Sequence, residues 1–153
     1  MSYVRPHVGF STPAWSPSNQ QDIKVLESVQ IRAVNMISGL TSETYEEKLN
    51  ELGLMSLEDR RLRFDLIQVF KILANVDNVK ADLWFEKTSV HHNRVTRQSA
   101  DPTCLVKKRV STNVRNHFFS SRVIDCWNKL PRDLRESQSV IDFEHKLDKH
   151  MRK

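Results

Sequence analysis

The sequence is poor in glycine and cysteine and contains no long apolar run. Its 3 glycines, Gly9, Gly39 and Gly53, lie too far apart to form a glycine-rich phosphate loop. No run of about 18 apolar residues exists, so we expect neither a membrane-spanning helix nor a membrane partner. Cys104 and Cys126 are the only cysteines and no CxxC or HxxxH pattern accompanies them, which favours two reduced, packed thiols over a disulfide or a zinc site.

Catalytic patterns are also missing. No GxSxG or HExxH motif is present, and the 6 histidines are scattered. Two-metal nucleotidyl transfer needs clustered carboxylates that hold ions about 3.5–4 Å apart. The acidic pairs Glu46–Glu47 and Glu58–Asp59 instead fall in expected first turns of helices, where the helix dipole and capping account for them. We therefore expect no catalytic residue, metal, cofactor or small-molecule substrate, and no enzymatic activity of the chain on its own.

The length of 153 residues suits one compact unit, and a hydrophobic content of 39% predicts a lean core. Within that unit we expect two regions. Residues 1–80 read as a helical region, and residues 81–153 as an irregular segment followed by a basic helix and a terminal helix. The first ten residues lack the apolar stretch of a secretory signal, and we expect an intracellular protein, nuclear or cytoplasmic.

Helical periodicity dominates the chain. Ser56 with Asp59, and Ser139 with Asp142, have the spacing of N-terminal helix caps, and Gly39 and Gly53 each follow a periodic segment. The predicted fold is mainly α, a small bundle of about five amphipathic helices with at most a minor β-hairpin. The helical segments are residues 22–38, 42–52, 56–75, 115–131 and 139–151.

The pattern is irregular between residues 76 and 112. Leu83, Trp84 and Phe85 resemble a short buried piece, and residues 104–110 alternate weakly between apolar and charged side chains. A strand needs a partner, and residues 89–96 are the candidate for a hairpin with residues 104–110. Upstream, Trp15 in a proline-rich lead-in is typical of an anchor that holds a loop to a core.

Residues 115–131 combine an apolar stripe with a cationic face. The stripe recurs at steps of four, four and three residues, and Pro131 ends the segment. Trp127 at its centre is predicted to lie in the core, and Phe118 is interpreted as a second core residue. The stripe consists of Phe119, Val123, Trp127 and Leu130.

The positive charge of the chain is concentrated in residues 104–135, here called the basic segment. This segment has eight basic and two acidic residues, a balance of +6, whereas the whole chain carries +5 and the remainder therefore −1. Such a concentration suits phosphate contacts with RNA or DNA, and a solvated basic face without a partner explains it equally well. The candidate nucleic-acid-binding residues are Lys107, Lys108, Arg109, Arg115, Arg122 and Lys129.

A second basic cluster consists of Arg60, Arg61 and Arg63. It could contact phosphate, but acidic neighbours such as Asp65 favour a solvated or ion-paired face.

Five blocks of the chain resemble the region that follows the palm in the reverse transcriptases of non-LTR (LINE-type, jockey-like) retrotransposons. They keep the order and spacing of that family over nearly the whole chain, although Val8-Gly9-Phe10 stands where the family tends to have a Leu-Glu-Tyr-like run. The blocks are residues 3–17, 22–40, 45–73, 115–131 and 139–151.

This resemblance implies a C-terminal, thumb-like fragment of an RNA-directed DNA polymerase that helps to grip the template and primer. The palm with its Tyr/Phe-x-Asp-Asp motif and the endonuclease domain have no counterpart in this sequence, so no catalytic residue is carried over. Two alternatives remain open: a non-catalytic module that docks on a polymerase palm, and a transposon remnant without a selected function.

Overall fold

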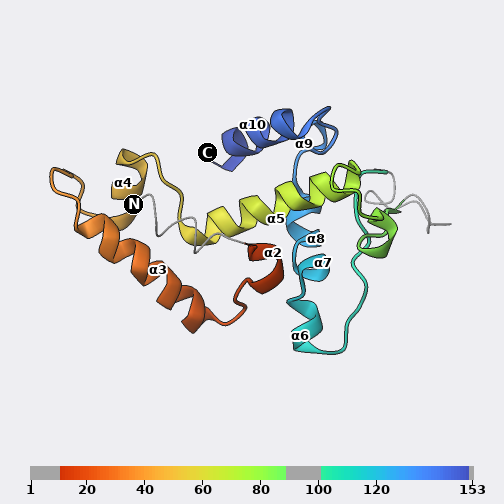
Figure 1. Ribbon diagram of the computed structural model, residues 1–153, viewed down its shortest axis with the longest axis horizontal. Coiled ribbons are helices and arrows are strands. Elements are labelled where there is room, and N and C mark those ends of the chain that lie inside the picture. Colours follow the sequence, from red (N-terminus) through yellow and green to blue (C-terminus); the bar gives the residue numbers. More distant parts are fainter. Residues whose placement is uncertain (1–10, 89–100, 152–153) are drawn as a thin grey trace. The chain divides into compact units, whose positions relative to one another are not determined.

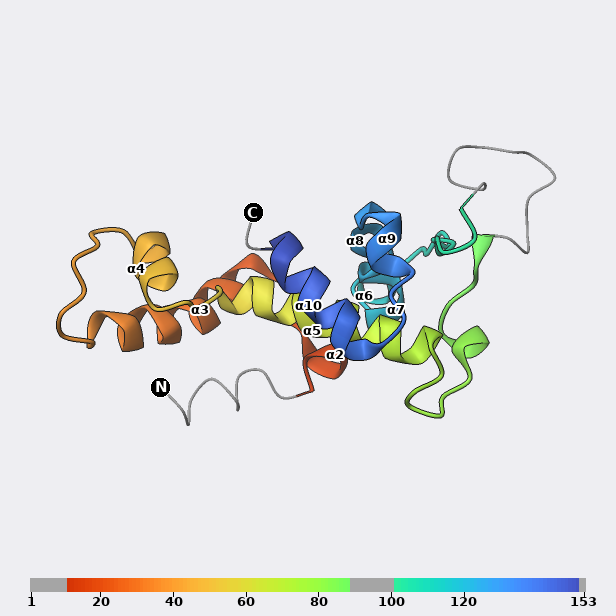
Figure 2. The same ribbon diagram turned by 90° about the horizontal axis from the view of Figure 1, so that it is seen from above.

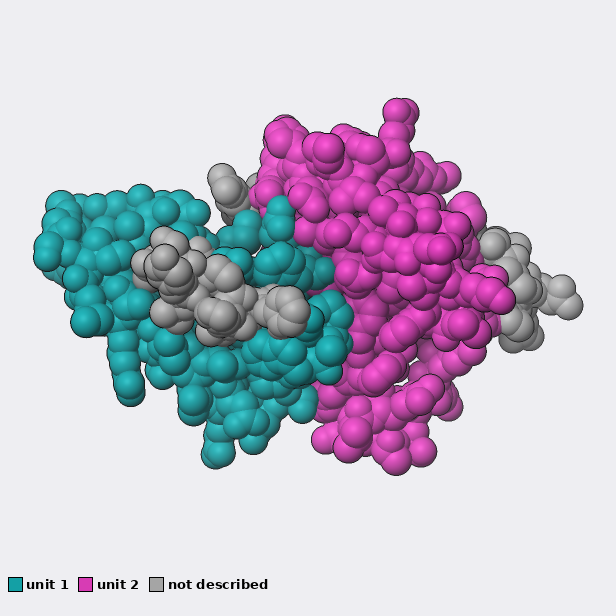
Figure 3. All heavy atoms as spheres, in the orientation of Figure 1, with its two compact units in different colours: residues 1–64 teal, residues 65–153 magenta. Residues whose placement is uncertain are grey.

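The computed structural model describes residues 11–88 and 101–151 of the chain (Figure 1). The prediction of a mainly α fold is confirmed, since the described residues form helices α2 to α10 and a single isolated β-bridge. The chain divides into two compact units, residues 1–64 and residues 65–153, which Figure 3 colours separately. The boundary falls within helix α5 (Leu57–Leu73), whereas the sequence pattern placed its two regions on either side of residue 80.

The helices of unit 1 are α2 (Thr12–Trp15), α3 (Gln20–Asn35), α4 (Tyr45–Glu51) and the start of α5. Side-chain caps mark the starts of α3, α4 and α5 in this unit. The Thr44 hydroxyl accepts from the amide of Glu47, whose carboxylate accepts from the Thr44 amide, so α4 begins at Tyr45 rather than at the predicted residue 42. Gly53 adopts a φ of +63° and closes α4 through Gly53 N–Asn50 O and Leu54 N–Leu49 O bonds.

The predicted cap of α5 is also present. The Asp59 amide donates to the Ser56 hydroxyl at 3.0 Å, and that hydroxyl donates to the Asp59 carboxylate at 2.8 Å. Gly39 has a φ of +92°, but α3 already ends at Asn35, so Gly39 follows the helix at a distance instead of closing it directly.

Polar contacts centred on Glu27 connect the helices of unit 1. The Glu27 carboxylate accepts from the Tyr45 hydroxyl of α4 and, at 3.0 Å, from the Leu57 amide at the start of α5. A carboxylate at a helix N-terminus satisfies an otherwise unpaired amide and interacts favourably with the dipole. Gln30 adds bonds from its amide to the Tyr45 hydroxyl at 2.8 Å and to the Met55 carbonyl at 3.1 Å.

Unit 2 contains the rest of α5 and a series of shorter helices. Figures 1 and 2 show α6, α7 and α8 following one another end to end, with α9 and α10 after them. Their bounds are η1 (Ala81–Leu83), α6 (Asn113–Asn116), α7 (Phe119–Arg122), α8 (Ile124–Lys129), α9 (Arg132–Arg135) and α10 (Val140–Met151).

An aromatic core holds unit 2 together. The rings of Phe70 and Phe143 stack with centroids 4.5 Å apart, and Trp127 lies 5.8 Å from Phe143. The predicted stripe of Phe119, Val123, Trp127 and Leu130 is buried throughout, and the predicted cap of α10 is present as an Asp142 amide to Ser139 hydroxyl bond of 3.1 Å.

The continuous helix predicted over residues 115–131 is wrong: it is divided into α6, α7 and α8. Phe118 is extended (φ −63°, ψ 145°), and the His117 carbonyl accepts from the Arg122 guanidinium at 3.2 Å. A carbonyl engaged in this way is directed away from the regular i→i−4 pattern of a helix. Pro131 ends α8 as predicted, because Leu130 before it is extended.

Residues 104–110 do not form the predicted strand. Leu105 forms an isolated antiparallel bridge with Lys87, and the Val106 amide donates to the Glu86 carbonyl at 2.8 Å. The expected partner, residues 89–96, lies outside the described residues.

Two predictions of burial are also wrong. Leu83 and Trp84 are exposed while Phe85 is buried, and Phe118 is exposed. Trp15 is 41% exposed, and its role as an anchor stays a prediction. Large apolar side chains do occur on protein surfaces, and Phe118, unlike Phe119, lies off the periodic apolar stripe.

Candidate nucleic-acid interface

The loop before the basic residues is fastened to α8. Asn128 brackets Leu105, accepting from its amide at 2.9 Å and donating to its carbonyl at 2.8 Å. The Trp127 indole donates to the Thr103 carbonyl at 3.0 Å. The start of the basic segment is therefore held in place by backbone contacts, although it forms no sheet.

Arg135 and Asp101 complete this attachment. The buried Arg135 guanidinium donates to the Asp101 carboxylate at 2.7 Å, to the Leu130 carbonyl at 3.2 Å and to the Cys104 sulfur at 2.9 Å. Burial favours the neutral acid, but bonds from Thr103 and the charge of Arg135 outweigh it and lower the pKa of Asp101 below its ordinary value. Arg135 therefore serves the fold and is not available to a ligand.

Lys107 and Lys108 are exposed and ion-paired. Lys107 pairs with Asp125 of α8, and Lys108 pairs with Glu86 at 2.9 Å while its side chain remains 73% exposed. Exposed pairs of this kind contribute about 0–1 kcal/mol, so a phosphate can compete for either cation.

Arg122 is placed differently from the other candidates. Its guanidinium forms two 3.0 Å bonds to the two oxygens of Asp65, and the side chains are 20% and 6% exposed. The same guanidinium lies 5.7 Å from the centroid of the Phe119 ring. A phosphate would have to displace a bidentate, largely buried pair, so Arg122 is the least accessible of the six candidates.

Arg109, Arg115 and Lys129 are exposed and form no ion pair with any residue of the described ranges. Arg115 lies over the Phe118 ring, 5.9 Å from its centroid. The structure brings Lys108 and Arg115 to one hollow between η1 and α6–α8, whereas Lys107 and Lys129 lie near Cys126 of α8. The six candidates therefore occupy more than one part of unit 2.

The second basic cluster, in unit 1, holds an unexpected feature. Arg61 is only 4% exposed, and its Nη1 and Nη2 atoms have no hydrogen-bond partner in the described structure. Arg60 lies over the Phe64 ring at 5.3 Å, and its burial lowers its pKa. The favoured interpretation of a solvated or paired face is therefore wrong for Arg61, and Asp65 pairs with Arg122 instead.

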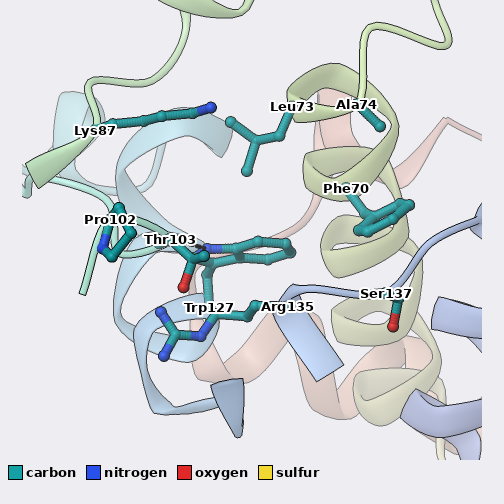
Figure 4. Close-up of a pocket in the computed structure, with 9 residues that line it drawn as sticks. All are labelled: Phe70, Leu73, Ala74, Lys87, Pro102, Thr103, Trp127, Arg135 and Ser137. Carbon is teal, nitrogen blue, oxygen red and sulfur yellow. Dashed lines mark hydrogen bonds between the residues drawn. The ribbon is translucent and has the colours of Figure 1, made fainter. Parts of the chain in front are cut away.

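A hollow of about 230 Å³ lies beside the unit 2 core. Figure 4 shows Trp127 between Phe70 and Leu73 of α5 and the loop residues Pro102 and Thr103. Two cations line the hollow: the buried Arg135, which is committed to Asp101, and the exposed Lys87, for which the described residues supply no ion pair.

Cys104 and Cys126 are both free thiols. Burial raises the pKa of Cys126, with smaller opposing effects from Lys129 and Lys107. Among residues 11–88 and 101–151, no group of three or more His, Cys, Asp or Glu side chains is placed to hold a metal ion. In the same part of the chain, every helix is too short or too polar to cross a membrane.

Comparisons with protein-family models, with curated proteins and with solved structures give no match to this chain.

Proposed function

We propose that the chain is a C-terminal, thumb-like fragment of a non-LTR retrotransposon reverse transcriptase that binds nucleic acid through phosphate contacts and has no polymerase activity of its own. The observation that carries the binding role is the set of exposed, unpaired cations Arg109, Arg115 and Lys129 within the described residues, on a segment with a charge balance of +6. Cations in this state reach phosphate without first breaking an internal pair.

Lys107 and Lys108 extend this set, because their partners are exposed or only partly buried. Arg122 and Arg135 are assigned to the fold. Contacts of this kind carry little sequence information, so the proposed activity is positional, supporting a template and primer rather than reading a site. The setting would be intracellular, where such elements meet chromosomal DNA.

The binding experiment compares two triple variants. Arg109→Ala/Arg115→Ala/Lys129→Ala removes the proposed contacts, and Lys24→Ala/Arg32→Ala/Lys149→Ala removes the same three charges elsewhere on exposed helix positions. Anisotropy of a labelled RNA–DNA duplex should show about a tenfold or larger loss of affinity for the first variant and a much smaller loss for the second. Equal losses would reject these residues as contacts.

The proposed origin has its own test. The genomic sequence upstream of the codon for Met1 should encode a palm with a Tyr/Phe-x-Asp-Asp motif, intact or decayed. An unrelated upstream sequence would contradict the proposal of origin and leave phosphate binding to be judged separately.

One observation favours a second candidate function, docking on a polymerase palm. Val25, Val29 and Met36 lie on one face of α3 and its C-cap and are exposed. If docking is the function, the isolated chain should bind an apolar dye and self-associate, and Val25→Ser/Val29→Ser should abolish both without changing duplex affinity. If the isolated chain is monomeric and does not bind the dye, docking is rejected as its function.

A further inference from the structure

Trp84 and Phe118, here called the aromatic pair, are the exposed rings of unit 2 nearest to the candidate cations. They are 39% and 49% exposed, and their planes differ by only 8° with centroids 6.3 Å apart. A flat ligand stacked on one ring is therefore nearly parallel to the other. Exposed rings with parallel faces are what unpaired nucleic-acid bases stack on.

One ring of the aromatic pair, Trp84, contacts the buried core of unit 2. Trp84 meets the buried Phe119 edge to face at 6.2 Å, and Phe119 in turn meets Phe85 at 5.9 Å. The extended backbone at Phe118, between α6 and α7, leaves that side chain exposed while its neighbour Phe119 enters the core. Because Trp84 contacts a buried ring, stacking of a base on it requires less ordering of its side chain than stacking on a freely rotating ring would.

The charges around the aromatic pair indicate where a neutral base would bind and where a phosphate would bind. Trp84 borders a hollow of about 120 Å³ whose lining includes two carboxylates and two cations, so the hollow has no net charge. They are Asp82, Glu86, Lys108 and Arg115. A neutral base suits such a surface better than a phosphate does, since a phosphate would also meet both carboxylates.

The surrounding cations suit the backbone of the same strand. Arg115 lies over Phe118 at 5.9 Å and is exposed to solvent, and Arg109 is exposed earlier in the same segment. Guanidinium planes both stack on bases and bind phosphate. The combination of a base-sized neutral surface and adjacent cations matches a single strand, since the bases of a duplex are already stacked and paired.

We propose that the aromatic pair is a base-stacking site for single-stranded nucleic acid, with Trp84 and Phe118 contacting a base and Arg115 and Arg109 contacting flanking phosphates. The inference rests on the proposed nucleic-acid binding and specifies the ligand as an unpaired strand. It gives unit 2 a contact with bases that the phosphate contacts alone do not supply.

The test uses the full chain and two 15-nucleotide probes with equal numbers of phosphates, oligo(dT) and an abasic strand. Wild type should bind oligo(dT) about tenfold or more tightly than the abasic strand, because stacking contributes to affinity only when a base is present. Trp84→Leu and, independently, Phe118→Leu should reduce that ratio towards one. Trp15→Leu, which alters a similarly exposed tryptophan in unit 1, should leave the ratio unchanged.

Each outcome separates this inference from the proposed function. Equal binding of both probes by wild type, or an unchanged ratio in both ring variants with wild-type circular dichroism, overturns the stacking site while phosphate binding stands. An equal loss of affinity for both probes in both ring variants also overturns it. Removing a contact with a base cannot weaken the binding of a strand that has no bases. If wild type binds neither probe nor a duplex, the proposed function itself fails.

Discussion

The two units reach their folds by different means. Unit 1 has few buried apolar side chains in its described part, namely Val34, Leu49 and Leu57, and relies on capped helices joined by Glu27 and Gln30. Unit 2 has an extensive aromatic and aliphatic core, centred on Phe70, Trp127 and Phe143, with short helices around it. Hydrogen bonds, both in helix caps and between helices, therefore have the larger share in the described part of the first unit, and burial of apolar side chains has it in the second.

This difference also decides what each unit can offer a partner. In unit 2 the core buries the apolar stripe and leaves cations such as Arg109 and Lys129 outside, and two exposed rings lie near Arg115. In unit 1 the exposed feature is the apolar face of α3. A polyanion suits the second unit, and an apolar partner suits the first.

The largest expected effect is a loss of core in unit 2. Trp127→Ala removes a fully buried indole and its bond to the Thr103 carbonyl, and should lower the free energy of unfolding by about 3–5 kcal/mol. Val34→Ala in unit 1 should cost about 2 kcal/mol. Urea denaturation monitored by circular dichroism measures both, and equal losses would contradict the contrast between the units.

The next effect concerns the buried ion pair of unit 2. Asp65→Ala leaves the Arg122 guanidinium largely buried without its carboxylate and should cost about 2–4 kcal/mol. The matched control is Asp125→Ala, which breaks the exposed pair with Lys107 and should change stability by about 0.5 kcal/mol or less. If Asp65→Ala were as mild as its control, Arg122 would be free to serve as a phosphate contact.

A stabilising change is expected in unit 1. Arg61→Met replaces a buried guanidinium whose Nη1 and Nη2 have no partner in the described structure, and should raise the free energy of unfolding by about 1–2 kcal/mol. Arg32→Met on the exposed face of α3 should be neutral. A clear destabilisation by Arg61→Met alone would show that its guanidinium is satisfied in solution.

Capping in unit 1 gives a smaller effect. Thr44→Ala removes the hydroxyl of the α4 capping box and should cost about 1 kcal/mol. Thr41→Ala alters an exposed threonine upstream of the cap and should change little. Thermal unfolding measures both variants. Equal melting temperatures would contradict a stabilising role of the Thr44 cap.

The smallest expected effect is the contribution of Asp101 to the pH dependence of stability, which is seen at acidic pH. The pKa of Asp101 in the folded state lies below the unfolded value of about 3.9. Ionised Asp101 therefore adds stability that is complete above the unfolded pKa and is lost as the pH falls through the folded pKa. Between pH 5 and pH 3 the wild type should lose more stability than Asp101→Asn, and parallel losses would remove Asp101 as a source of acid sensitivity.

The sequence predicts what is encoded locally. Ser56, Ser139 and Pro131 set helix ends through neighbours three or fewer residues away, and all three act as predicted. The apolar stripe from Phe119 to Leu130 is buried as its spacing requires.

What the sequence does not predict depends on residues far apart in the chain. The orientation of Arg122 towards the His117 carbonyl is fixed by Asp65, 57 positions earlier, and accompanies the break between α6 and α7. Asn128 accepts from the Leu105 amide across 23 positions, a contact that no local pattern indicates. Trp84 is apolar and large, which favours burial, yet it is 39% exposed in the folded chain.

The most direct test of the central claim is the affinity of the chain for an RNA–DNA duplex measured across a salt series. If Arg109, Arg115 and Lys129 neutralise phosphates, log K should fall linearly with log salt, and the triple variant, which keeps Lys107 and Lys108, should have a slope shallower than that of the wild type by about 2 to 3. A flat line for the wild type would contradict the account.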